Sequence, residues 1–243
     1  MSVNIPTMAG ANPFSVNNTR VRRLTVNGES LVEKTIHRNA PLAVTSADLK
    51  AEMDTYREQL TAAGVPMPRV ADSHVTDDTI VYLCEDGGLN LVERYEQPEL
   101  LTNGRADVLT SAIDIIKRAI DAGLAIDPHI KNFVGEDADL AYVDFSPPLT
   151  MAYVEARCAV AKDTERDILR ENFAYFTPYF LPYHFAGDFL NVDPTADRLF
   201  PALHSLLTDT GLLSGVPLPE FVSQARAIRA LEDRRLQERI YLI

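Results

Sequence analysis

The sequence predicts an α+β fold in which a small β-rich part precedes a larger, mainly α-helical part. Three observations lead to this prediction. Two hairpin patterns and one amphipathic helix fall within residues 1–88, and apolar residues at helical spacing dominate residues 89–243. A Glu-Asp-Gly-Gly stretch at residues 85–88 stands between them. Because such a change of periodicity marks a change of structural unit, we expect two domains, 1–88 and 89–243.

The first part contains two predicted β-hairpins. Asn27-Gly28 is the dipeptide most typical of a type I′ turn, which requires positive φ at both central positions. The second hairpin turns around residues 76–78, where a threonine precedes two aspartates. The four expected strands are residues 20–26, 29–36, 70–75 and 79–84.

A helix is expected between these hairpins. Ser46 or Asp48 can cap its start, and Gly64 ends it, because glycine readily takes the positive φ found after a helix. Four apolar residues recur at helical spacing and define its buried face: Leu49, Met53, Tyr56 and Leu60.

The second part is predicted to be mainly helical, with one short hairpin. The hairpin should turn over residues 135–139. Further helical stretches, interrupted by prolines, should begin at about residue 164. The expected elements are a helix over 107–122, strands over 132–134 and 140–143, and a last helix over 221–240.

Composition excludes several classes of protein. The formal net charge is −12 over 243 residues, whereas a nucleic-acid-binding protein needs a basic surface. No apolar run approaches 18 residues, and the N-terminal residues lack the pattern of a signal peptide. The two cysteines form no C-x-x-C pair. We therefore expect a cytoplasmic protein that binds neither nucleic acid nor membrane.

Motif searches exclude several kinds of active site. The sequence contains no G-x-x-x-x-G-K-[ST], G-x-G-x-x-G, G-x-S-x-G or H-E-x-x-H pattern. Its five histidines are scattered and are never paired at a spacing typical of zinc ligands. Sites of these types are therefore not expected.

One group of polar residues does suggest chemistry. Asp127 and Asn132 precede the short hairpin, and Asp144 follows it, so the hairpin should bring these side chains to one end. Two carboxylates and an amide oxygen form a set of hard oxygen donors that suits Mg²⁺. One carboxylate would then remain to orient a hydroxyl group.

The spacing of these residues resembles a known family. Asp127-Pro-His129-Ile-Lys-Asn132, followed by a hairpin and Asp144-Phe145, is similar to the catalytic loop and metal-binding motif of the protein-kinase-like superfamily. The D-x-H-x-x-N spacing resembles the aminoglycoside (choline-kinase-like) phosphotransferase branch. The resemblance implies a bilobal protein-kinase-like fold, with a small β-rich N-lobe and a larger helical C-lobe.

Upstream residues extend the resemblance over roughly residues 10–150. Lys34 resembles the strand lysine that holds the α- and β-phosphates of ATP, and Glu52 resembles the helix glutamate that pairs with it. Residues 60–68 are similar to the L-x-x-x-G-V-P-x-P ending of that helix. Glu85 lies where the resemblance places the hinge, whose backbone would meet adenine.

The resemblance implies an ATP- and Mg-dependent phosphotransferase. Lys34 would neutralise phosphate charge, Asn132 and Asp144 would hold Mg²⁺, and Asp127 would accept the proton of a hydroxyl on a small molecule. Residues 89–243 carry 24 acidic and 15 basic side chains. Because this acidity would repel ATP unless it is neutralised, we expect metal dependence and a neutral or cationic acceptor.

Two other functions are compatible with the sequence. One is phosphorylation of Ser or Thr in a peptide, as in natural-product biosynthesis. The other is a pseudokinase that binds or scaffolds without turnover, because Ala125 replaces the usual histidine and residues 10–19 contain a single glycine. Seven aromatic residues within 173–185 are expected to pack in the core, with a wall of the acceptor pocket as the alternative.

Overall fold

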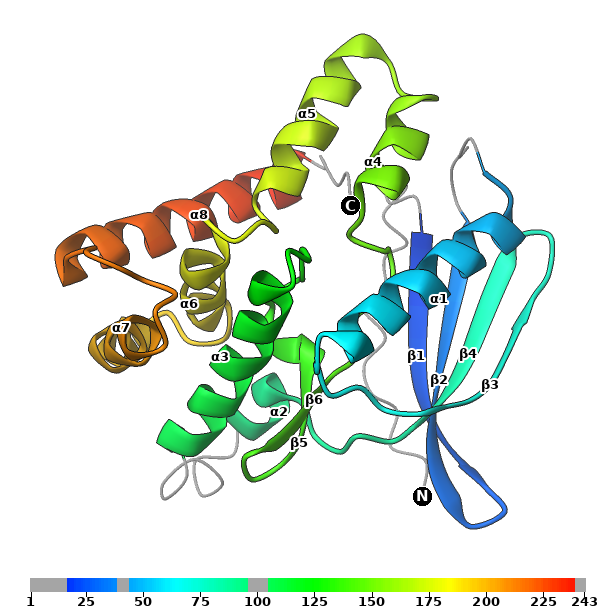
Figure 1. Ribbon diagram of the computed structural model, residues 1–243, viewed down its shortest axis with the longest axis horizontal. Coiled ribbons are helices and arrows are strands. Elements are labelled where there is room, and N and C mark those ends of the chain that lie inside the picture. Colours follow the sequence, from blue (N-terminus) through cyan, green and yellow to red (C-terminus); the bar gives the residue numbers. More distant parts are fainter. Residues whose placement is uncertain (1–16, 39–43, 96–104, 239–243) are drawn as a thin grey trace.

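The computed structural model describes residues 17–38, 44–95 and 105–238 (Figure 1). This part of the chain is a mixed α/β protein with one four-stranded sheet, one two-stranded hairpin and several helices. Residues 10–19, which contain a single glycine, lie mostly outside the described residues. In chain order the elements are β1 (Asn17–Val26), β2 (Glu29–Arg38), α1 (Ser46–Ala62), β3 (Val70–Val75), β4 (Thr79–Glu85), α2 (Leu91–Tyr95), α3 (Arg105–Asp121), η2 (Ile130–Asn132), β5 (Phe133–Glu136), β6 (Asp139–Tyr142), α4 (Met151–Cys158), α5 (Asp163–Ala174), α6 (Leu181–Val192), η3 (Ala196–Leu199), α7 (Phe200–Asp209) and α8 (Leu218–Glu238).

The four-stranded sheet is antiparallel, with the strand order β1-β2-β4-β3. The two predicted hairpins are confirmed. Asn27 has φ of 54° and Gly28 has φ of 86°, as a type I′ turn requires. In this order β2 lies inside the sheet, where Lys34 is paired with Val21 on one side and Tyr82 on the other. The lysine is thus placed on a strand that is hydrogen-bonded along both edges.

The N-cap of α1 lies one residue before Ser46, the earlier of the two predicted caps. The N-cap is Thr45, whose side chain accepts a hydrogen bond from the backbone N–H of Asp48, while the Asp48 carboxylate accepts from the backbone N–H of Thr45. Asp48 belongs to this capping box as the residue at N3 and not as the N-cap. Ser46 instead donates its hydroxyl to the carbonyl of Asp77. The predicted end is confirmed, since Gly64 follows the helix with φ of +79°.

One continuous apolar core joins the sheet, α1 and the later helices. Figure 1 shows α1 lying across the sheet, with α3 and the β5–β6 hairpin beside it and α6, α7 and α8 beyond. The shared core contains the predicted apolar face of α1 together with Ile36, Ile80, Phe133 and Phe185, which are fully buried. Burial of this kind is the dominant stabilising term in folding. It also fixes α1 against the segments that precede and follow the β5–β6 hairpin.

The β5–β6 hairpin differs in detail from the prediction. The predicted turn over residues 135–139 is wrong, because Gly135 and Glu136 continue the first strand and the turn is Asp137-Ala138. Only glycine fits at position 135, where a Cβ atom would lie 2.0 Å from the carbonyl oxygen of Asp139. Asn132 belongs to the 3₁₀ turn η2 that precedes the strand.

The helical region also holds elements that the sequence pattern did not predict. Helices α2 and α4 are short, with five and eight residues, so each offers too few turns for a clear apolar periodicity. Core packing of segment 173–185 is confirmed for Phe185 and Tyr183, whereas Tyr179 is 71% exposed. Close packing of α6 against α8 requires Gly187, whose added Cβ would lie 2.7 Å from the carbonyl oxygen of Ala225.

Among the described helices none combines the length and apolar character needed to cross a membrane. Cys84 and Cys158 are both free thiols.

Candidate functional site

Four of the predicted site residues meet at the open end of the β5–β6 hairpin. The Lys34 ammonium lies 2.8 Å from Oδ1 of Asp144. The Asn132 side-chain amide nitrogen lies 3.5 Å from Oδ2 of Asp144 and donates to the backbone carbonyl of Asp127 at 3.3 Å. The sheet therefore supplies the cation, and the segments that flank the hairpin supply the amide and the two carboxylates.

Lys34 and Asp144 form an ion pair that is largely removed from water. Their side chains are 11% and 22% exposed. The ammonium also lies 4.9 Å from the centre of the Phe145 ring, within the range of a cation–π contact. Removing one member of a buried pair leaves an uncompensated charge, so each of these residues depends on the other.

Asn132 is oriented so that one of its amide atoms remains available. Its nitrogen donates to the carbonyl of Asp127, and no hydrogen bond among the described residues uses its Oδ1. The backbone carbonyl of Asp127 can only accept, so the nitrogen end of the Asn132 amide must face the loop. The buried amide, 5% exposed, is thereby held with its oxygen free to act as a ligand.

The oxygen donors present fit a magnesium ion that is completed by phosphate and water. Asn132 Oδ1 and Asp144 Oδ2 are hard ligands, and Mg²⁺ is commonly held by one or two protein oxygens together with substrate phosphates. The described residues hold no group of three or more His, Cys, Asp or Glu side chains able to bind a metal by themselves.

Asp127 is held by its own loop. Its Oδ1 accepts from the backbone N–H of His129 at 3.1 Å and contacts Nδ1 of the same histidine. On the other side of the ring, Nε2 lies 3.9 Å from Asp188 of α6. Asp188 is 3% exposed and accepts from the backbone N–H of Ile130 at 2.7 Å. His129 therefore lies between two carboxylates, those of Asp127 and Asp188.

The surroundings of Asp127 favour its ionised form. Burial by itself raises the pKa of this carboxyl, but the charge and hydrogen bond of His129, with the charges of Lys131 and His184, outweigh that effect. The net result is a pKa well below the usual range for aspartate. An ionised carboxylate with a low pKa accepts a hydrogen bond well but holds a proton poorly.

This shift predicts how stability depends on pH. The unfolded carboxyl has a pKa of about 3.9, so the stabilisation from the lowered folded pKa is present in full above about pH 5 and is lost as the pH falls below that range. Urea unfolding of the wild type and Asp127→Asn should give a difference in unfolding free energy that shrinks as the pH falls from 5 towards 3. A difference that grows on acidification would contradict the shift.

The resemblance implied that Glu52 pairs with Lys34, but the structure gives Glu52 a different partner. Its Oε1 instead accepts a hydrogen bond from the hydroxyl of Thr150 at 2.5 Å. Thr150 is the N-cap of α4, where its side chain also accepts from the backbone N–H of Tyr153. Glu52 thus connects α1 to the segment that follows Asp144.

Glu85 ends β4 at the connection to the helical region. Its backbone N–H donates to the carbonyl of Arg69, and its side chain forms an ion pair with Arg69 at 2.7 Å. The following turn is held by Arg23, which donates to the carbonyl of Gly88 at 2.6 Å and lies 3.3 Å from Asp86. Glu85 is therefore at the predicted position in the chain, but its own amide is used within the protein.

Sequence reasoning missed several residues that hold this site. Tyr56 and Tyr142 form hydrogen bonds with the backbone on either side of Ile126. Asp188 of α6 accepts a hydrogen bond from the same loop, and Thr150 donates one to the carboxylate of Glu52. Tyr56 was predicted only as part of an apolar helix face. A buried tyrosine needs a partner for its hydroxyl, and that requirement was the available signal.

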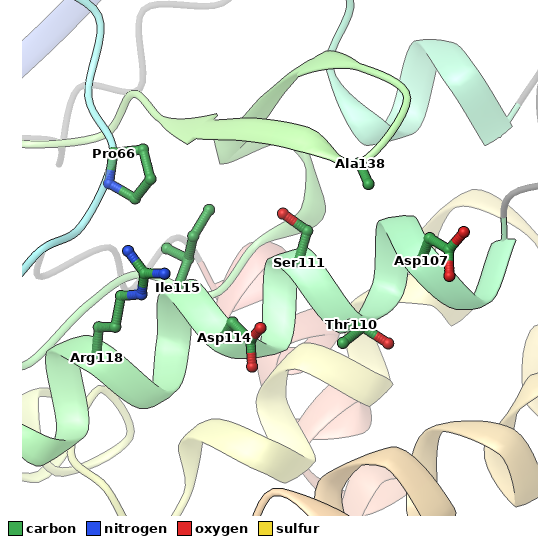
Figure 2. A pocket seen from close by; sticks show the side chains of 8 residues that line it. All are labelled: Pro66, Asp107, Thr110, Ser111, Asp114, Ile115, Arg118 and Ala138. Carbon is green, nitrogen blue, oxygen red and sulfur yellow. The ribbon is translucent and has the colours of Figure 1, made fainter.

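One cavity in the described part of the chain lies away from the predicted site residues. It has a volume of about 320 Å³ and lies between α3 and the β5–β6 turn (Figure 2). Figure 2 shows Ser111, Ile115 and Arg118 on the side of α3 that faces Pro66 and the β5–β6 turn. None of the predicted site residues lines it. The Arg118 guanidinium is already engaged, since it donates to the carbonyl of Gly64 at 2.5 Å.

Comparison with known proteins gives no assignment: no protein-family model matches this sequence, and no curated protein matches it.

Proposed function

We propose that this protein is an ATP- and Mg-dependent phosphotransferase that moves the γ-phosphate to a hydroxyl of a small molecule. The observation that carries the proposal is the ion pair between Lys34 and Asp144, with Asn132 and Asp127 beside it. These residues come from segments far apart in the sequence. Their convergence in the order that resembles the kinase-like superfamily supports a bilobal fold of that type.

The chemistry of the proposed site is mainly one of charge and position. Phosphoryl transfer requires neutralisation of phosphate charge and alignment of the attacking oxygen. Lys34 would face the phosphates from the sheet, and Asn132 and Asp144 would hold Mg²⁺, which shields phosphate charge when it is bound. Asp127, kept ionised, would accept a hydrogen bond from the acceptor hydroxyl and align it.

A pseudokinase is the second candidate, and the contact of Glu52 with Thr150 favours it. In the proposed enzyme Glu52 would steady Lys34, whereas here its carboxylate is used by α4. A protein fixed in this arrangement would bind nucleotide without transferring phosphate. Both candidates would therefore bind nucleotide, but only the first would transfer phosphate.

Thermal unfolding with and without Mg-ATP tests the proposal. At a ligand concentration 100 times its Kd, binding adds about 2.7 kcal/mol, which corresponds to a rise in Tm of about 5–10 °C for a chain of this size. ATP with EDTA should give a much smaller rise. Release of ADP in the presence of hydroxyl acceptors, including Ser- and Thr-containing peptides, then separates enzyme from pseudokinase. No rise in Tm with Mg-ATP would refute nucleotide binding.

A further inference from the structure

Two buried tyrosines contact the backbone of the loop that carries Asp127. The hydroxyl of Tyr56, on α1, donates to the carbonyl oxygen of Ala125 at 2.7 Å. The hydroxyl of Tyr142, at the end of β6, accepts from the backbone N–H of Asp127 at 3.1 Å. Both tyrosines are 0% exposed. The loop is therefore tied at two points that lie two residues apart.

The donors and acceptors define the direction of these bonds. A carbonyl oxygen can only accept and a backbone N–H can only donate, so Tyr56 donates its proton to Ala125 and Tyr142 uses a lone pair for Asp127. Each hydroxyl therefore makes one hydrogen bond to the loop, Tyr56 as the donor and Tyr142 as the acceptor.

Both hydroxyls keep their protons in this position. Burial, followed by the charge of Asp144, raises the pKa of Tyr56 well above its ordinary value. Burial, followed by Tyr56 and Asp144, does the same for Tyr142. Two neutral hydroxyls therefore bind the loop backbone.

From this geometry we infer that Tyr56 and Tyr142 are positioning residues that set the backbone of the loop at Asp127. Ala125 is 8% exposed, so its carbonyl would lack a partner without Tyr56. The bonds do not reach the Asp127 carboxylate itself. They fix the peptide units on either side of Ile126, and the direction of the Asp127 side chain follows from that backbone.

The main experiment measures hydrogen exchange of the Asp127 amide, which donates to the hydroxyl of Tyr142. Tyr142→Phe removes its acceptor and should speed its exchange about tenfold or more, since a lost buried hydrogen bond corresponds to about one such factor. Tyr56→Phe removes the donor to the Ala125 carbonyl and should speed exchange over residues 125–127 by several-fold.

Tyr82→Phe is the matched control. Tyr82 is also fully buried, and its hydroxyl donates to Asp54 of α1 at 2.8 Å, but it does not contact the loop. Compared at equal stability, this variant should leave the Asp127 amide as protected as in the wild type. If all three variants exchange alike at Asp127, the positioning role is wrong and the tyrosines only stabilise the fold.

A kinetic measurement adds a readout that rests on the proposed function. With water in place of the acceptor hydroxyl, slow hydrolysis of ATP to ADP and phosphate can be followed. Tyr56→Phe should lower kcat about tenfold and leave the KM for ATP unchanged, whereas Tyr82→Phe should change neither. Faster exchange with an unchanged kcat would overturn the inference. If the wild type fails to bind Mg-ATP, the proposed function fails, while the exchange measurement still decides whether the tyrosines hold the loop.

Discussion

Asp144→Asn is expected to abolish the stabilisation of the protein by Mg-ATP. The substitution removes the negative charge that faces Lys34 and replaces one proposed metal-ligand oxygen with an amide. A metal that needs both Asn132 and Asp144 would lose its only anionic protein ligand. We therefore expect the wild-type rise in Tm of about 5–10 °C to fall to about zero in the variant.

The variant should also be less stable without ligand, and the experiment must separate the two effects. Removing one partner of a buried ion pair costs about 3–5 kcal/mol, and partial exposure of Lys34 places this site near the lower value. The ligand effect is thus measured from the variant's own Tm. Asp54→Asn is a suitable control, because Asp54 forms an ion pair with Lys50 outside the site. Full Mg-ATP stabilisation of Asp144→Asn would contradict the proposed role of Asp144.

Asp127→Asn should have the second large effect, on turnover and not on binding. The amide has the same shape and can still accept from His129, but it offers a weaker acceptor to the hydroxyl that would attack. General-base catalysis contributes about 10²- to 10⁴-fold to the rate, so kcat should fall within that range while the Mg-ATP shift in Tm is retained.

Asp121→Asn is the control for this experiment. Asp121 is an aspartate on α3 that pairs with the exposed Lys117, and it should change neither binding nor turnover. Loss of Mg-ATP binding in Asp127→Asn would assign Asp127 to nucleotide binding. Unchanged ATP hydrolysis would remove it from the proposed chemistry.

Much of the local structure could be predicted from the sequence because its causes are local. Asn27-Gly28 permits positive φ at two successive positions, and the face of α1 repeats with the helical period. The start of α1 was less certain, since Thr45, Ser46 and Asp48 are all good caps. Only the backbone geometry decides which of these side chains accepts the bond.

The candidate site could be predicted only in part, because its remaining contacts join segments far apart in the sequence. The spacing of Asp127, Asn132 and Asp144 indicated that a short hairpin would bring them together. No pattern indicated that Glu52 would contact Thr150, which lies 98 residues later, or that Tyr56 would contact Ala125, 69 residues later. These partners depend on how α1 packs against the loops, and apolar periodicity says which face is buried but not which polar atoms meet there.

The two contacts of α1 also determine where the chain can tolerate insertions. Glu52 and Tyr56 lie about one helical turn apart and reach different loops from the same helix. One residue inserted between them would rotate everything beyond it by about 100° and advance it by about 1.5 Å, so the two anchors could no longer be satisfied together. Extra residues in the turn at Asp77 and Asp78 leave the helical phase unchanged. Length variation among proteins that keep this site should therefore fall in turns, and the four-residue interval within α1 should be constant.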